Sequence, residues 1–389
     1  MVRIMCSTND FRSKLLKEDF CNLNAVKYAE KIKNTGSVVI WGSGYAGQLV
    51  YDFLKKFDAL KNVKYYADNS EAKWGTKKNG LLILSPKEVV KMVKENSNTY
   101  IIVASEYLAN IREQLLLLGI KSGIIDMKGS GLAKDYLAFK SETPYMIINA
   151  HMVDYEKAYS YLSDERSKAV YLGILNCKIS LDSKYLVGIA DPDENQYFDK
   201  DIIHLNENEV FCDCGSYNGD TLETFVALSG GKYKKYIAIE ADKDTYTELK
   251  KKVAENGYKN IQTHNVACWN EKTVLKFQSA QTAGHVTEIG DISVQADVLD
   301  NILKDEKVTF LKMDIEGAEE MALKGAARVI QENKPILAVC IYHSLEDYYK
   351  IPLIIKEFNQ EYKLFTRHYK DLYDHETVCY AIPKERFTI

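Results

Sequence analysis

The chain has 389 residues, of which 46% are hydrophobic and 27% are charged, and only six are prolines. These proportions are typical of a folded globular chain of two or three domains and exclude a largely disordered one. A net charge of −4 gives no electrostatic reason to expect a nucleic-acid partner. No apolar run approaches the ~18 residues of a membrane span, and the first residues lack the apolar segment of a signal peptide. We therefore expect no membrane span and a cytoplasmic protein.

A glycine-rich turn follows the first apolar strand, at 38–41, and opens a helical segment in a G-x-G-x-x-G pattern. The next strand ends in an acid 21 residues after the last glycine (68 − 47), close to the position of a ribose-binding acid. We predict a Rossmann-like nucleotide-binding domain over residues 1–130. A nicotinamide cofactor, a nucleotide sugar, or glycines that serve packing alone all fit this pattern. The candidate residues of this second nucleotide site are Gly42, Gly44, Gly47 and Asp68.

Residues 131–208 differ from what precedes them, because they are rich in tyrosine and charge and poor in glycine. Helical patterning over 155–175 predicts a helical connector here. Upstream, Ser85 and Glu88 have the spacing of a capping box, with Pro86 at the first helical position, and predict a helix start.

A second strand–turn–helix unit begins at 210–214 and predicts another domain over 209–389. Apolar strands follow at 236–239, 310–313 and 336–341, and an insertion at 268–294 has the alternation of a hairpin. Two last strand-like runs, at 362–366 and 377–382, lie too close together for a helical crossover and should pair antiparallel. The predicted fold class is therefore α/β, with two doubly wound Rossmann-like domains joined by the helical connector. The second domain has the strand pattern of a class I methyltransferase fold with a C-terminal antiparallel hairpin.

Candidate groups for binding S-adenosylmethionine follow the first two strands of this second domain. Asp213 ends the first strand and could reach the methionine ammonium, and Glu240 ends the second, where two carboxylate oxygens can accept the two ribose hydroxyls. Gly215 and Gly219 permit close approach of a ligand to the backbone. The predicted cofactor-binding residues are thus Asp213, Gly215, Gly219 and Glu240.

Several runs of this domain resemble the FkbM family of S-adenosylmethionine-dependent methyltransferases. They are 210–221, Glu240, the D-x-E-G-x-E run at 314–319 and the L-K-G-A run at 323–326. The resemblance covers roughly 195–385 and continues through 341–352, 367–369 and 376–378. It implies a class I fold that transfers a methyl group, usually to oxygen, often on a sugar, another glycan or a secondary metabolite. It also implies that Asp314 faces the sulfonium.

A sugar hydroxyl is a poor nucleophile at neutral pH, so its methylation calls for a nearby base. Asp314 and His343 follow neighbouring strands, where ligands gather in open α/β sheets, and are the candidate bases. Glu316 and His368 are candidates for orienting the acceptor. Asp314, Glu316 and His343 could instead bind a divalent cation, but no ligand spacing compels this, and the metal is left open.

The sequence thus predicts an S-adenosylmethionine-dependent O-methyltransferase that acts on a small-molecule or glycan acceptor. Two alternatives stay open. One is a nucleotide-sugar-binding or regulatory protein whose methyltransferase-like domain is inactive, and the other is an NAD-dependent sugar oxidoreductase centred on the first glycine-rich turn. We expect no nucleic-acid partner, and the sequence leaves room for a homo-oligomer.

Overall fold

A computed structural model gives the fold, and it describes residues 9–105, 107–121, 123–126, 137, 142–278, 284–287, 290, 292–370 and 373–387. The chain forms two units, which we describe separately. The N-terminal unit comprises residues 16–150 and 175–185, and the C-terminal unit comprises the residues up to 15, 151–174 and 186–389. The predicted connector at 131–208 is therefore shared between the two units, and its long helix α9 (Glu165–Ser180) contributes residues to both.

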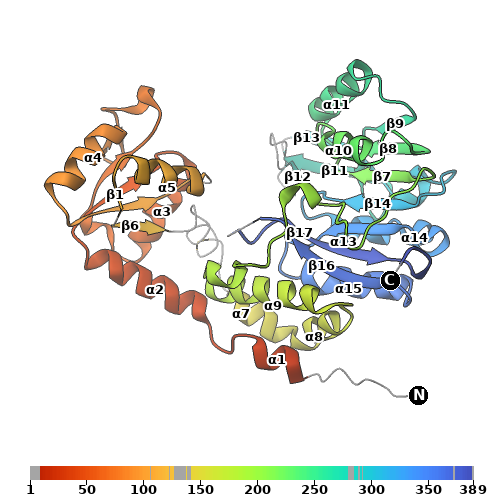
Figure 1. Ribbon diagram of the computed structural model, residues 1–389, viewed down its shortest axis with the longest axis horizontal. Helices are drawn as coiled ribbons and strands as arrows, with labels where there is room; N and C mark the ends of the chain where they lie inside the picture. Colours follow the sequence, from red (N-terminus) through yellow and green to blue (C-terminus); the bar gives the residue numbers. More distant parts are fainter. Residues whose placement is uncertain are drawn as a thin grey trace. The chain divides into compact units, whose positions relative to one another are not determined.

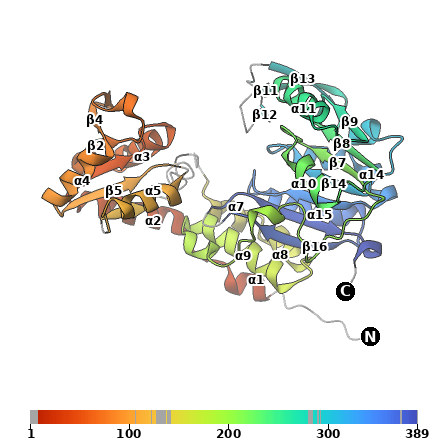
Figure 2. The same cartoon turned by 45° about the horizontal axis from the view of Figure 1, so that its top comes forward.

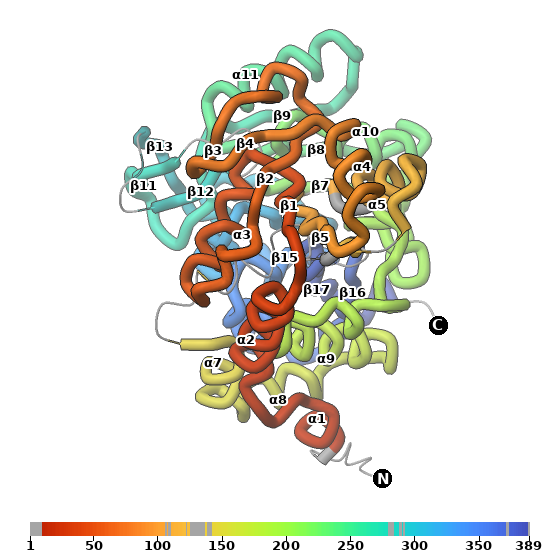
Figure 3. Tube along the Cα trace, turned by 90° about the vertical axis from the view of Figure 1, so that its left-hand side faces the viewer, coloured from red at the N-terminus to blue at the C-terminus, as the bar shows by residue number. Residues whose placement is uncertain are grey.

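The N-terminal unit is built on a six-stranded sheet in the order β3-β4-β2-β1-β5-β6, parallel except for the β3–β4 pair (Figures 1 and 3). Successive residues of β1 point to opposite faces of the sheet. Val38 and Ile40 accordingly belong to one buried cluster, and Val39 and Trp41 to another. The strands are β1 (Ser37–Trp41), β2 (Val63–Ala67), β3 (Lys77–Lys78), β4 (Leu81–Leu84), β5 (Thr99–Val103) and β6 (Ile124–Asp126).

The helices of this unit are α2 (Phe20–Lys33), α3 (Tyr45–Lys56), α4 (Pro86–Glu95), α5 (Leu108–Leu117) and α7 (Pro144–Ala150). Helix α4 begins as the sequence predicts. The Ser85 side chain accepts the Glu88 backbone N–H, the Glu88 carboxylate accepts the Ser85 N–H, and Pro86 occupies the first turn. Helix α3 begins at the glycine-rich turn with no side-chain cap.

The C-terminal unit carries a seven-stranded sheet in the order β16-β17-β15-β14-β7-β8-β9 (Figure 1). Strands β15, β14, β7, β8 and β9 are parallel to their neighbours in that run, whereas β17 pairs antiparallel with both β15 and β16. The predicted mixed α/β fold with parallel sheets is confirmed. The strands are β7 (Val210–Cys214), β8 (Lys235–Ile239), β9 (Ile261–His264), β14 (Phe310–Met313), β15 (Ile336–Cys340), β16 (Lys363–His368) and β17 (Thr377–Ile382).

A small second sheet lies beside the β8–β9 side of this large sheet (Figure 2). Its order is β10-β13-β11-β12, and β11 pairs antiparallel with β13, so the insertion forms paired strands as its alternation predicts. These strands are β10 (Ala267–Cys268), β11 (Thr273–Gln278), β12 (His285–Val286) and β13 (Ile292–Asp297).

The helices of the C-terminal unit are α1 (Asn9–Lys14), α8 (Met152–Ser160), α10 (Asp220–Leu228), α11 (Lys243–Glu255), α12 (Leu299–Ile302), α13 (Glu319–Lys324), α14 (Ala327–Asn333) and α15 (Asp347–Phe358). Helix α8 packs on α15, and the loop after α8 joins the edge of the sheet, where the Ser163 N–H donates to the Leu364 carbonyl at 2.8 Å. No helix in the described ranges is long and apolar enough to cross a membrane.

One buried guanidinium ties this sheet edge to the segments that precede it. Arg367 is only 2% exposed, and it pairs with Asp164 at 2.8 Å and with Asp199 at 3.2 Å. Its Nη1 also donates to the Ser167 hydroxyl at 2.8 Å. Burial alone would lower the pKa of Arg367, but these partners raise it, so the side chain stays charged.

Candidate active site

A cavity of about 360 Å³ opens at the carboxyl ends of β7, β8 and β14. This volume lies within the ~300–1,000 Å³ that is usual for small-molecule sites. Ligands gather at this edge in open α/β sheets, because the loops that leave adjacent parallel strands diverge there. The cavity wall includes three of the residues predicted from the sequence to bind cofactor or acceptor beside Gly215, namely Glu240, Asp314 and Glu316.

Glu240 is oriented by the backbone around it. Its Oε2 accepts the Tyr217 N–H at 2.9 Å, and its Oε1 accepts the Asp242 N–H at 2.8 Å. Each carboxylate oxygen has two lone pairs, so one on each oxygen stays available to a ligand. Burial is the main reason why the pKa of Glu240 is raised above its usual value.

Gly215 and Gly219 both have left-handed backbone angles, with φ of +79° and +82°. A Cβ on Gly215 would lie 1.8 Å from the backbone oxygen of Asp314, so the protein's own packing already requires glycine there. Gly219 caps α10 and faces Leu249, and it is not part of the cavity wall. The two glycines therefore shape the loop, and only Gly215 borders the cavity.

Asp213 lies beneath the cavity and not in its wall. Its side chain is fully buried and pairs with the Lys312 ammonium at 2.9 Å, and the Tyr236 hydroxyl donates to its other oxygen. The Lys312 ammonium also donates to the Gly215 carbonyl at 2.8 Å. Burial raises the pKa of Asp213 and opposes the charge on Lys312, but Asp213 and Asp314 raise the pKa of Lys312 above the usual range, so the ammonium stays charged. Asp213 thus anchors the loop from below.

Asp314 follows β14 and receives two tyrosine hydroxyls. Tyr197 donates to its Oδ2 at 2.6 Å, and Tyr342 donates to its Oδ1 at 3.3 Å. Although burial acts to raise the pKa of Asp314, the charges of Lys312 and His343 hold it below its usual value. Asp314 is therefore an ionised carboxylate in the cavity wall.

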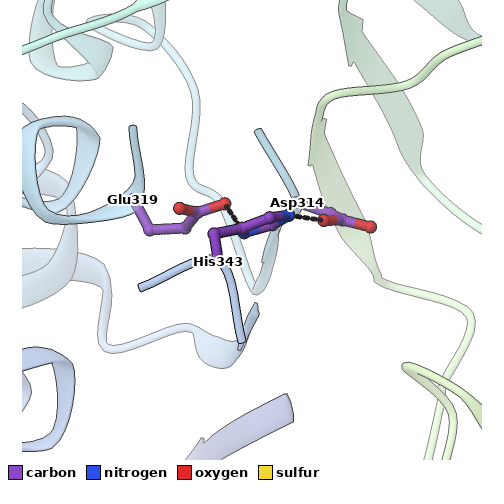
Figure 4. A group of neighbouring side chains, drawn as sticks. All are labelled: Asp314, Glu319 and His343. Carbon is purple, nitrogen blue, oxygen red and sulfur yellow. Dashed lines mark ion pairs between the residues drawn. The ribbon is translucent and has the colours of Figure 1, made fainter. Parts of the chain in front are cut away.

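His343 lies behind the wall among three carboxylates, a group that we call the carboxylate–imidazole cluster: Asp314, Glu316, Glu319 and His343. Its Nε2 is 3.6 Å from Asp314 Oδ1 and 3.4 Å from Glu316 Oε2, and its Nδ1 is 3.1 Å from Glu319 Oε1. In Figure 4 the imidazole stands between the Asp314 and Glu319 carboxylates. Burial acts to lower the pKa of His343, but the carboxylates raise it to about 11.

His368 is fully buried and is absent from the cavity wall. Its Nδ1 lies 3.0 Å from the Thr377 hydroxyl across the β16–β17 pair, and burial lowers its pKa to about 4. The ring is therefore neutral and packed inside the sheet, and it is not placed where it could orient an acceptor.

Among the wall residues that received no role from the sequence, four lie around Asp314: Gln196, Tyr197, Tyr342 and Glu376. They form one network with Asp314, because Gln196 Nε2 donates to Glu376 Oε2 at 2.6 Å and lies 3.2 Å from the Tyr197 hydroxyl. All four stand in or next to runs that resemble FkbM members. Their place in these runs was the one feature of the sequence that could have marked them as site residues. Spacing alone did not indicate that segments some 180 residues apart meet at Asp314.

The glycine-rich turn of the N-terminal unit borders a second cavity, of about 630 Å³. A Cβ on Gly42 or Gly47 would come within about 2 Å of a backbone oxygen, whereas a Cβ on Gly44 would meet nothing within 4 Å. Asp68 is engaged inside the protein, since it accepts hydrogen bonds from Ser43, Ser70 and Lys73. Of the four predicted residues, Gly42, Gly44 and Asp68 border this cavity.

Comparisons with known proteins agree with this arrangement. Residues 213–367 match the Methyltransferase FkbM domain, and residues 34–125 match the family described as C2185-like, N-terminal. The chain matches no curated protein.

Among solved structures, the fold is similar to Methyltransferase FkbM from Methylobacillus flagellatus, with a TM-score of 0.70 and 19% identity over 96% of this chain and 99% of that one. Smaller overlaps are with UDP-D-quinovosamine 4-dehydrogenase from Vibrio fischeri (TM-score 0.20, 19% identity, 24% of this chain and 77% of that one) and with Aeropyrum pernix fibrillarin bound to S-adenosyl-L-methionine (TM-score 0.30, 12% identity, 47% and 71%). The family match falls on the half of the chain that holds the first cavity, and that C-terminal half belongs to the FkbM family of methyltransferases.

Proposed function

We propose that this methyltransferase takes its methyl group from S-adenosylmethionine and transfers it to a hydroxyl of a sugar, a glycan precursor or a secondary metabolite. The observation that carries the proposal is Glu240, whose carboxylate borders the cavity with one lone pair free on each oxygen. A ribose offers two adjacent hydroxyl donors, which is the complement of that arrangement.

The rest of the wall fits the remaining parts of the cofactor. Ala241, Val266, Ala267 and Phe277 give an apolar surface next to Glu240, as an adenine ring requires. The acids Asp220, Asp314 and Glu316 supply negative charge, as a cationic sulfonium and an ammonium require. When bound, S-adenosylmethionine supplies an activated methyl group, so this chain's residues need only to bind, orient and move a proton.

We assign to Asp314 the role of the base that accepts the proton of the acceptor hydroxyl. It lies in the cavity wall, whereas His343 lies behind it, and the Tyr197 and Tyr342 hydroxyls fix its orientation. As the new bond to carbon forms, the acceptor oxygen loses its proton, and a carboxylate at this position can take it. Most of the rate acceleration then comes from holding the acceptor in line with the methyl group.

Calorimetry with S-adenosylhomocysteine tests the cofactor site without knowledge of the acceptor. We expect the wild type to bind it and Glu240→Gln to bind at least ~10-fold more weakly, because an amide offers one acceptor atom where the carboxylate offers two. The exposed Glu248 on α11 gives a matched control, and Glu248→Gln should bind as the wild type does. Equal affinity in all three proteins would contradict the assignment.

The acceptor can be identified by incubating the enzyme and S-adenosylmethionine with small-molecule extracts and finding the compound that gains ~14 Da. Binding of S-adenosylhomocysteine without any such product from a broad set of extracts would favour the alternative of an inactive, regulatory domain.

For the N-terminal unit we propose a second nucleotide site at the glycine-rich turn. The supporting observation is Gly44, which no described neighbour requires to be glycine, beside the exposed Tyr45 and Tyr107. A phosphate next to the start of α3 would explain it. Gly44→Val should keep the fold but abolish binding of UDP or NAD⁺ in calorimetry. Binding of NAD⁺ alone would favour the oxidoreductase alternative, and binding of neither by the wild type would refute the site.

A further inference from the structure

The carboxylate–imidazole cluster holds more acceptor atoms than the described protein satisfies. Glu319 is fully buried, and its Oε2 has no hydrogen-bond partner. His343 is only 10% exposed, and neither of its ring nitrogens makes a hydrogen bond of acceptable geometry with a described residue. Buried polar groups without partners cost free energy, so His343 Nε2, which faces Asp314 and Glu316, points to a missing partner on that side of the ring.

The charge of the cluster indicates the sign of that partner. Three carboxylates, from Asp314, Glu316 and Glu319, surround a single imidazole. One ligand atom each from Asp314, Glu319 and His343 lies within 4.8 Å of the others. A cation at this place would neutralise buried negative charge.

We propose that the carboxylate–imidazole cluster binds a divalent cation of the oxygen-preferring class, Mg²⁺ or Mn²⁺, with Asp314 and His343 Nε2 as ligands. The cation replaces the proton on Nε2, and that proton is released to solvent. Glu316 lies 3.4 Å from the same nitrogen and is within reach as a further ligand. Neighbouring ligand atoms of an octahedral ion at ~2.1 Å are ~3 Å apart, so the side chains need to move by well under 1 Å. A donor set rich in carboxylate with one imidazole suits this class of ion better than a thiolate-preferring one.

Glu319 has a different role in this site, as the residue that positions the imidazole. Its Oε1 faces Nδ1 at 3.1 Å and also accepts the Ile315 N–H at 2.8 Å, so the backbone holds the carboxylate in place. A carboxylate on the second nitrogen of a metal-bound histidine fixes the ring and its tautomer. The arrangement in Figure 4, with one carboxylate on each side of the ring, has this form.

The site borders the cavity through Asp314 and Glu316, so a bound cation would lie at the wall where an acceptor hydroxyl is expected. A cation there would stabilise the developing alkoxide. This role in methyl transfer rests on the function proposed above, whereas the cation site itself does not.

The experiment is a titration of the full-length, EDTA-treated and desalted protein with Mn²⁺, in which the six-line EPR signal of the free ion is followed. We expect the wild type to deplete the free signal and Mg²⁺ to compete. Asp314→Asn and His343→Gln should lose the binding, and Glu319→Gln should weaken it ~10–100-fold, as loss of a carboxylate behind a histidine ligand does. Glu320→Gln is the control, because Glu320 pairs with Lys324 and Lys350 outside the cluster, and it should bind as the wild type does.

Circular dichroism of each variant shows whether it is folded. If Asp314→Asn or His343→Gln unfolds, Glu319→Gln decides the question, because its amide oxygen can still accept the Ile315 N–H. No depletion by wild-type protein at millimolar Mn²⁺, or equal affinity in Glu319→Gln and Glu320→Gln, would overturn the proposal. Calorimetry with S-adenosylhomocysteine in the presence of EDTA tests the cofactor site separately, so the two proposals can fail independently.

Discussion

Removing the Lys312 ammonium should destabilise the protein by about 3–5 kcal/mol, the usual cost of leaving one partner of a buried ion pair uncompensated. The structure gives the reason for a value in that range. Asp213 is fully buried and Lys312 is 3% exposed, so neither side chain can be rescued by water. In Lys312→Met the carboxylate keeps only the Tyr236 hydroxyl, and the Gly215 carbonyl loses its donor as well.

Guanidinium chloride unfolding, followed by circular dichroism, measures this cost. The double variant Asp213→Asn/Lys312→Met removes both charges and should be more stable than Lys312→Met alone, with a coupling energy of about 2 kcal/mol. Because Asp213 lies beneath the cavity wall, folded Asp213→Asn should bind S-adenosylhomocysteine within ~3-fold of the wild type, which is under ~1 kcal/mol. A cost below about 1 kcal/mol for Lys312→Met would refute the reasoning on the ion pair.

Two further predictions concern the turns at the strand ends. Gly215→Ala should lower the free energy of unfolding by more than about 2 kcal/mol in thermal unfolding, because its Cβ would overlap a backbone oxygen at 1.8 Å. The control is Gly230→Ala, at a residue with a φ of +60° and open space around it, which should cost only the ~1–2 kcal/mol of a left-handed residue. Equal losses in the two variants would contradict this explanation. In the N-terminal unit, burial acts to raise the pKa of Asp68, but hydrogen bonds from Ser43, Ser70 and Lys73 lower it to about 2. The ionised Asp68 therefore contributes about 2 kcal/mol to the free energy of unfolding above pH ~4, and this contribution is lost as the pH falls towards 2. Unfolding monitored by tryptophan fluorescence should show Asp68→Asn less stable than the wild type at pH 7 and nearly equal to it at pH 2, and a difference that does not shrink would be the contrary result.

Patterns among neighbouring residues were enough to predict several strands and helix starts. The apolar run at 210–214, the capping box at Ser85 and the alternation at 268–294 each describe neighbours in the chain, and each appears as a strand, helix start or strand pair. Glu240 was predictable for the same reason, because an acid directly after a buried parallel strand has to lie at the ligand-binding edge of the sheet.

The positions of Asp213, His368 and Tyr197 depend on contacts between distant segments, which local sequence patterns do not reveal. Asp213 has the same position in the strand–turn pattern whether its carboxylate points at a ligand or at Lys312, which lies 99 residues later (312 − 213) on the neighbouring strand. His368 occupies an inward-facing place on β16, which only its pairing with β17 determines. Likewise, nothing in the local pattern around Tyr197 indicates that its hydroxyl reaches Asp314.

The burial of Arg367 affects the choice of boundaries for a truncated, expressed fragment of this protein. A fragment that spans only residues 213–367, the extent of the family match, would omit both Asp164 and Asp199 and would end at Arg367 itself, so the contacts that hold this side chain at the sheet edge would be lost. It would also lack β17, the strand that joins β16 to the rest of its sheet. Workable truncations of the catalytic half have to begin upstream of Asp164 and keep the C-terminal strand, so the foldable piece is larger than the piece that sequence similarity outlines.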